Sequence, residues 1–206
     1  MHLVYIHGNG ASATSFNFIR SQFPGIPETM LEYTSSDGFY PNLEAMRQAL
    51  EGHDRIFFIA HSLGGIYALH LANGLRDRVL GAVTLSTPYG GSEAAEVVKY
   101  MMPFHRVMRE IGPTSAPIVQ ANLLSITHPW TNIVTLDGHS PLMTTANDGV
   151  VTRDSMRFRS DMQLIEVLSS HYEVVQSEAA VTVIREAIGS VDSRSPQDGL
   201  QVTMHD

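Results

Sequence analysis

The sequence contains no cysteine. A disulfide framework, a thiolate nucleophile and a zinc site built on cysteines are therefore excluded, and any nucleophile has to be a hydroxyl, a carboxylate or an amine. Lysine is almost as scarce, because Lys99 is the only lysine among 13 basic residues, which are outnumbered by 21 acidic ones. With a formal net charge of −8 and no basic stripe, the chain is not expected to bind nucleic acid.

Long apolar segments are also missing. The sequence has no span of about 18 apolar residues, and it opens without the charged and apolar regions of a signal peptide. We therefore expect no transmembrane anchoring and a cytoplasmic protein, or a secreted one if a signal peptide has been removed. No HExxH motif or comparable ligand cluster is present, so we expect no metal site.

Short apolar segments alternate with helical patterns along the chain, which is typical of a parallel sheet covered on both faces. The sequence predicts strands over 2–6, 29–33, 55–60, 79–86, 132–137 and 163–168, and helices over 14–21, 42–51, 63–76 and 177–188. At 206 residues the chain fits one domain. We predict a doubly wound α/β fold with a mostly parallel sheet, in a domain that spans residues 1–189.

Two segments interrupt this pattern. Residues 88–128 contain short helical patterns broken by prolines and are interpreted as a small helical insert. Its apolar residues either pack the insert onto the domain or form a cap in which Met101, Met102 and Phe104 line a substrate pocket, since flexible thioethers adapt to varied apolar ligands. Residues 190–206 are polar and lack a helical or strand period, so we expect a flexible tail there.

The third predicted strand leads into Ala60-His61-Ser62-Leu63-Gly64-Gly65 and then directly into a helical pattern. A serine at the tip of so sharp a turn needs small residues two positions to either side, and Ala60 and Gly64 meet that need. The turn would expose the Ser62 hydroxyl and place the Leu63 N–H at a helix N-terminus, where it can stabilise an oxyanion. The alternative is that Ser62 is an ordinary helix N-cap.

A second source of oxyanion donors is the first strand, which ends in His7-Gly8-Asn9-Gly10. Two closely spaced glycines let the backbone approach a substrate. Taken alone this segment is equally well a glycine-rich turn. Together with the serine turn it favours an oxyanion site built from the backbone N–H groups of Asn9 and Leu63.

His171 is chosen as the catalytic base from ten histidines because it follows the last predicted strand, and loops at the carboxyl ends of parallel strands face the ligand crevice. His61 is interpreted as structural. The acid should lie between the serine and the histidine in the sequence. Asp148, in the turn-like Asn147-Asp148-Gly149, is favoured over Asp137, which is predicted to end the fifth strand.

With these residues in place the chain resembles the α/β-hydrolase superfamily, and within it the small bacterial lipases and esterases of the minimal Bacillus type. The resemblance rests on Val4-Tyr5-Ile6-His7-Gly8-Asn9-Gly10, the Ser62 turn, the spacing from Asp148 to His171, and Ser86-Thr87-Pro88-Tyr89-Gly90-Gly91-Ser92. It implies hydrolysis of carboxylic esters through an acyl-enzyme without a cofactor. It also implies that the first two strands of the larger fold are missing.

The function predicted from the sequence is therefore that of a serine hydrolase with Ser62 as nucleophile, acting on small-molecule esters with an apolar acyl group. A thioesterase, an amidase or an acyltransferase would use the same residues and differ only in leaving group or acceptor. A non-catalytic member of the fold that binds a ligand is the alternative from another class, since a fold does not fix a function.

Overall fold

The structure, a computed structural model, describes residues 1–92, 110–140, 143 and 145–193. Within these residues six parallel strands form a single sheet in the order β2-β1-β3-β4-β5-β6. The strands are β1 (His2–Ile6), β2 (Glu28–Leu31), β3 (Ile56–His61), β4 (Val79–Leu85), β5 (Trp130–Thr135) and β6 (Gln163–Val167). The predicted doubly wound α/β fold is confirmed.

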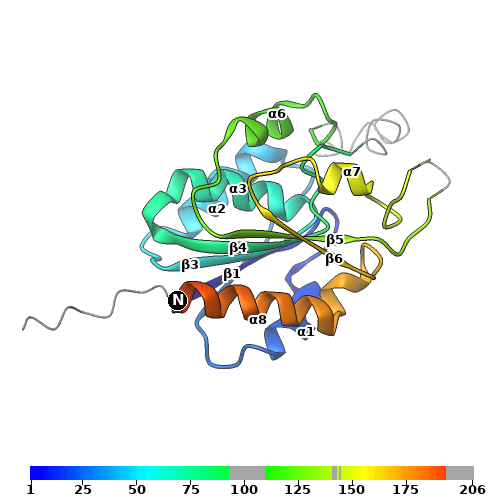
Figure 1. The fold of residues 1–206 in the computed structure, drawn as a ribbon. Helices are drawn as coiled ribbons and strands as arrows, with labels where there is room; N and C mark the ends of the chain where they lie inside the picture. Colours follow the sequence, from blue (N-terminus) through cyan, green and yellow to red (C-terminus); the bar gives the residue numbers. More distant parts are fainter. Residues whose placement is uncertain (93–109, 141–142, 144, 194–206) are drawn as a thin grey trace, which may run out of the picture.

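Helices cover both faces of this sheet (Figure 1). One face carries α2 (Phe39–Ala49), α3 (Leu63–Leu75), α6 (Ala116–Leu123) and the short α7 (Arg153–Met156). The other face carries α1 (Asn17–Ser21) and α8 (Glu178–Asp192). Single 3₁₀ turns lie at η1 (Ala13–Phe16), η2 (Arg76–Arg78) and η3 (Glu173–Gln176).

Strand β3 shows how the sequence divides between two cores. Successive side chains of a strand point to opposite faces. Ile56, Phe58 and Ala60 therefore belong to the core beneath α2 and α3, whereas Phe57 and Ile59 belong to the core above α8. All five side chains are fully buried, which explains why this strand is a continuous apolar run with no polar alternation.

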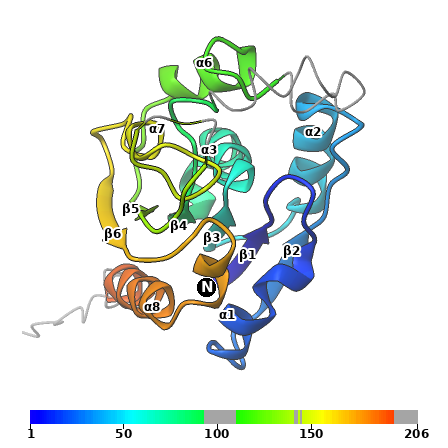
Figure 2. The same ribbon diagram turned by 90° about the vertical axis from the view of Figure 1, so that its right-hand side faces the viewer.

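The carboxyl ends of the six parallel strands meet at one edge of the sheet, which faces the viewer in Figure 2. The loops that follow β1, β3, β4, β5 and β6 gather there. Chemistry-bearing residues that follow different strands in the sequence are brought together by this arrangement.

Two of the differences from the predicted boundaries affect the site and the C-terminal helix. Strand β5 begins at Trp130 and ends at Thr135, two residues earlier than expected, so Asp137 lies beyond the strand and is exposed. Helix α8 continues to Asp192, which corrects the predicted helix end at 188, so residues 190–192 belong to the helix. Residues 194–206 of the predicted tail lie outside the described residues. The helix continues because Val191 packs into the core and is only 5% exposed. The sequence does not indicate this contact, because the neighbours of Val191 are polar or glycine.

Part of the predicted insert 88–128 is described, and it contains helix α6, which packs against α3. Residues 93–109 lie outside the described residues. Among the residues that the structure describes, no helix is both long and apolar enough to cross a bilayer.

Candidate active site

Ser62 occupies a sharp turn between β3 and α3. Its backbone has φ 53° and ψ −124°, a conformation that side chains rarely adopt and that costs about 1–3 kcal/mol. The turn is closed by a tight crossing over β1, because a Cβ at Gly64 would lie 2.2 Å from the carbonyl oxygen of Ile6. Glycine at position 64 is thus a steric requirement, as the sequence pattern predicted.

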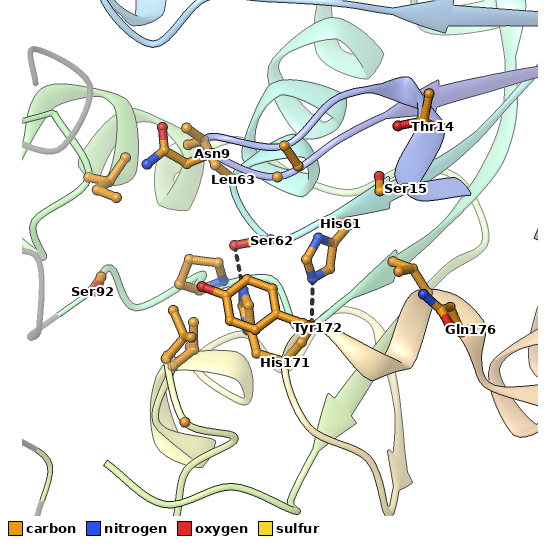
Figure 3. A pocket seen from close by; sticks show the side chains of 18 of the residues that line it. Asn9, Thr14, Ser15, His61, Ser62, Leu63, Ser92, His171, Tyr172 and Gln176 are labelled. Atoms are coloured by element: carbon orange, nitrogen blue, oxygen red, sulfur yellow. Dashed lines mark hydrogen bonds between the residues drawn. The ribbon is translucent and has the colours of Figure 1, made fainter. Parts of the chain in front are cut away.

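His171 and Asp148 lie beside this serine. The His171 Nε2 atom is 3.0 Å from the Ser62 Oγ atom (Figure 3), and the His171 Nδ1 atom is 2.8 Å from Asp148 Oδ2. The two partners assign the tautomer: Nδ1–H donates to the carboxylate, which leaves Nε2 to accept the serine proton. Three residues from the segments that follow three different strands therefore form one hydrogen-bonded chain.

The Asp148 carboxylate is buried and fully hydrogen-bonded. Its Oδ1 accepts the N–H groups of Val150 and Val151, and its Oδ2 accepts from His171 and from the Thr135 hydroxyl. Burial alone would raise the pKa of Asp148, but the hydrogen bonds from His171, Thr135 and the Val151 N–H, together with the electrostatic interaction with His171, outweigh it and lower the pKa below its ordinary value. The carboxyl group is therefore ionised at neutral pH.

The long loop after β5 returns Asp148 to the sheet edge. Antiparallel bridges join Gly138 to Asn147 and Asn147 to Thr152, and the Asp148 carbonyl accepts the His171 N–H at 3.0 Å. The competing Asp137 side chain is exposed, and its backbone N–H donates to Ser169. Of the two aspartates, it is the Asp148 carboxylate that contacts His171.

The loop after β1 lies across the pocket from the His171 loop, and both Asn9 and Leu63 line the cavity. Leu63 is the first residue of α3, so its N–H has no carbonyl one turn earlier in the helix to bond to. The Asn9 Oδ1 atom accepts from Ser35 Oγ, which fixes its side chain. His7 stabilises the loop by stacking on Tyr33 with ring centres 4.3 Å apart.

His61 directly precedes Ser62 in the chain, but its side chain contacts His171. Its Nε2 donates to the His171 carbonyl oxygen at 2.8 Å, and its ring lies so close to Gly8 that a Cβ there would be 2.9 Å from Nδ1. Burial, and to a lesser degree the neighbouring His171, lower the pKa of His61 to about 3. The ring is therefore neutral and ties the His171 loop to β3.

A cavity of about 540 Å³ opens above Ser62. Apolar side chains contribute much of its wall, namely Phe18, Leu63, Pro88, Ile111, Val150, Val151 and Val175. Polar side chains of Thr14, Ser15 and Gln176 lie at one end of it (Figure 3). The predicted pocket residues Met101, Met102 and Phe104 lie outside the described residues, and their role stays a prediction.

Sequence reasoning missed the hydroxyl groups that support the site. Thr135 donates to Asp148, Ser86 hydrogen-bonds Thr135, and Thr87 donates to the Ser62 carbonyl oxygen at 3.0 Å. In the sequence, the segment that begins at Ser86 stands out only because it resembles a segment of small lipases and esterases. Its contacts with a strand 49 residues further along the chain depend on sheet order, which local patterns do not specify.

Within the described ranges no group of three or more histidine, aspartate or glutamate residues is arranged to hold a metal ion. The described residues of the site bring a hydroxyl, an imidazole and a carboxylate together in series.

No protein-family profile matches the sequence, and no curated protein of similar sequence was found. Solved structures do match. A metagenomic carboxyl esterase, MGS0156, is 17% identical with a TM-score of 0.72, over 94% of this chain and 76% of the esterase. The lipase BlEst2 of Bacillus licheniformis is 12% identical with a TM-score of 0.62, over 92% and 91% of the two chains.

A third match catalyses different chemistry. A haloalkane dehalogenase variant, DbeA-M1, from Bradyrhizobium elkanii is 14% identical with a TM-score of 0.65, over 95% of this chain and 91% of the dehalogenase. At identities this low, structural similarity shows a shared fold but not a shared reaction. Taken with the six-stranded parallel sheet and its strand order, these similarities show that the chain has the α/β-hydrolase fold.

Proposed function

We propose that this protein is a serine hydrolase that cleaves carboxylic esters through an acyl-enzyme on Ser62. One observation carries the proposal: Ser62 Oγ, the His171 imidazole and the Asp148 carboxylate form a continuous chain with distances of 3.0 and 2.8 Å at the base of a cavity. A serine hydroxyl is a weak nucleophile until an adjacent base accepts its proton, and this arrangement supplies that base.

In the proposed mechanism His171 Nε2 takes the Ser62 proton while the serine oxygen attacks the ester carbonyl carbon. Asp148 holds the imidazole in the required tautomer and stabilises its protonated form. The backbone N–H groups of Asn9 and Leu63 bind the oxyanion of the tetrahedral intermediate.

The intermediate collapses when His171 gives its proton to the leaving alkoxide, and the alcohol departs. A water molecule, deprotonated by the same imidazole, then attacks the acyl-enzyme. Breakdown of the second tetrahedral intermediate releases the carboxylic acid and returns the proton to Ser62, so no cofactor enters the balance.

The cavity favours an apolar acyl group. Its wall carries aliphatic side chains from several segments, including Ile111, Val151 and Val175. A volume of about 540 Å³ lies within the range of small-molecule sites and is large enough for an ester of moderate chain length.

The experiment is a rate comparison across p-nitrophenyl esters of graded acyl length, together with a matched thioester and a matched anilide. We expect the ester to be the best of the three, and Ser62→Ala to reduce kcat by about 10⁶-fold, as loss of such a nucleophile does. A preferred thioester or anilide would reassign the protein to a thioesterase or an amidase. Transfer of the acyl group to an added alcohol in preference to water would make it an acyltransferase. Turnover that survives Ser62→Ala would contradict the proposal.

A further inference from the structure

Behind the Asp148 carboxylate lies a chain of two hydroxyl groups that the proposed mechanism does not use. Thr135 Oγ1 is 2.6 Å from Asp148 Oδ2, and Ser86 Oγ is 2.8 Å from Thr135 Oγ1. Both side chains are completely buried, with exposed fractions of 0%. Thr135 is the last residue of β5, and Ser86 directly follows β4, so two neighbouring strands deliver the hydroxyls to the same point.

The direction of these hydrogen bonds follows from the charge of the acid. An ionised carboxylate can only accept, so the Thr135 hydroxyl must donate its single proton to Asp148 Oδ2. The threonine oxygen is then left as an acceptor, and the Ser86 hydroxyl donates to it. The Thr135 hydroxyl proton has one alternative acceptor, the Met156 sulfur at 3.5 Å, which is much weaker than the carboxylate. Both hydroxyl dipoles therefore point toward the negative charge.

The Thr135 hydroxyl donates to Asp148 Oδ2, the same oxygen that accepts the His171 Nδ1–H. Asp148 Oδ1 is held by the N–H groups of Val150 and Val151, which belong to its own loop. Oδ2 is held by His171 and by Thr135, and of these only Thr135 belongs to the sheet. Without it, rotation of the carboxylate about its last bond would be opposed only by the loop and by the imidazole that it is meant to position.

Ser86 reaches this position at a conformational cost. Its backbone has φ 53°, in the left-handed region that side chains rarely adopt. Strain of this kind persists where the surrounding structure over-determines it, and it clusters at functional sites. Here it places a hydroxyl against Thr135 in a region with no access to water.

We infer that Thr135, and through it Ser86, are positioning residues that hold the Asp148 carboxylate in the orientation His171 requires. The inference rests on the proposed function, because a carboxylate needs this precision only if His171 acts as a base. Neither hydroxyl contacts the substrate, and both act through Asp148.

Two substitutions at Thr135 separate the hydrogen bond from packing. Thr135→Val keeps the branched shape and removes the donor, whereas Thr135→Ser keeps the donor and removes the methyl group. Because hydrogen bonds to charged groups are strong, we expect Thr135→Val to lower kcat by roughly 10- to 100-fold with KM nearly unchanged. Thr135→Ser should restore most of kcat. The reverse order, in which valine is tolerated and serine is not, would overturn the inference and leave Thr135 as a packing residue.

A double-mutant cycle between Thr135 and Asp148 is the second test. In an Asp148→Asn background the carboxylate is gone, so adding Thr135→Val should cost about twofold or less. Equal fold losses in the two backgrounds would overturn the inference. Ser86→Ala, one bond further from the charge, should lower kcat by only about two- to fivefold. A Ser86→Ala loss as large as that of Thr135→Val would overturn the order of the chain.

Rates of covalent labelling of Ser62 by a fluorophosphonate, measured below each variant's unfolding midpoint, give the same comparison without any ester. If the wild type is labelled at Ser62 and Thr135→Val is labelled equally fast, the positioning role is wrong and the serine hydrolase stands. If the wild type is not labelled at Ser62, the proposed function itself has failed.

Discussion

Two serines follow adjacent strands in nearly the same geometry, yet only one of them is hydrogen-bonded to a histidine side chain. Ser62 follows β3 and Ser86 follows β4, and the preceding residues His61 and Leu85 are register partners in the sheet. Both serines have φ 53°, and each donates its N–H to the carbonyl oxygen of the next strand. A strained backbone at a strand end therefore does not by itself place a serine hydroxyl beside an imidazole.

The difference lies in the residues that come after each serine. Leu63-Gly64-Gly65 turns at once into α3, which leaves the Ser62 hydroxyl facing the cavity and the His171 Nε2 atom. Ser86 is followed by Thr87 and Pro88. The Ser86 hydroxyl is buried and hydrogen-bonded to Thr135. The Ser62 hydroxyl faces an imidazole that can accept its proton. The Ser86 hydroxyl instead donates to the Thr135 oxygen, and the Thr135 hydroxyl donates to the ionised Asp148 carboxylate.

After loss of Ser62 itself, the largest effect is expected from removing the charge of Asp148, to which Ser62 is linked through His171 and Ser86 through Thr135. Asp148→Asn should lower kcat by about 10⁴-fold with folding intact, because the amide stabilises the wrong tautomer of His171. Asp137→Asn is the matched control and should change kcat little, since that side chain is exposed. Steady-state kinetics on both variants tests this, and a crippled Asp137 variant would show that the acid is misassigned.

A steric change can break the Ser62 turn alone. Gly64→Ala would place a Cβ 2.2 Å from the Ile6 carbonyl oxygen, so either β1 or the turn must move. We expect a loss of stability of about 2–4 kcal/mol in urea unfolding and a large loss of activity. Gly74→Ala, in the same helix but with no atom within 4 Å of the new Cβ, should instead stabilise by about 0.5–1 kcal/mol. Similar effects at the two positions would contradict the packing described for the turn.

The neutral His61 ring gives a pH dependence with a defined sign. Its folded-state pKa is about 3, against an ordinary value of 6.5, so between these values the unfolded chain binds more protons than the folded chain. His61 should therefore reduce the free energy of unfolding as the pH falls through this window, by up to about 1.4 kcal/mol per pH unit. His61→Gln should flatten the slope, with His139→Gln as a control at an exposed position. An unchanged slope in His61→Gln would show that the ring is not held neutral.

The smallest effect is expected at the C-terminus. Deleting residues 194–206 should leave the thermal midpoint close to that of the full chain. Deleting 190–206 should lower it by several degrees, because Val191 is lost from the core. Calorimetry on the two truncations distinguishes these cases, and equal midpoints would mean that Val191 contributes nothing to stability.

The sequence predicted those parts of the fold and the site whose determinants are local. Three such features can be recognised in the sequence itself: the apolar run of β3, the small residues around Ser62, and the position of His171 after the last strand. The order of the strands, and hence the meeting of Ser86, Thr135 and Asp148, depends on tertiary packing. The end of α8 was misplaced for the same reason, because one buried valine outweighs several polar neighbours.

The contrast between the two serines is tested most directly by covalent labelling of the native protein with a fluorophosphonate, followed by peptide mapping. The account predicts stoichiometric modification of Ser62, none at Ser86, and loss of all labelling in Ser62→Ala but not in Ser86→Ala. Modification at Ser86, or labelling that survives Ser62→Ala, would contradict the assignment of Ser62 as the nucleophile.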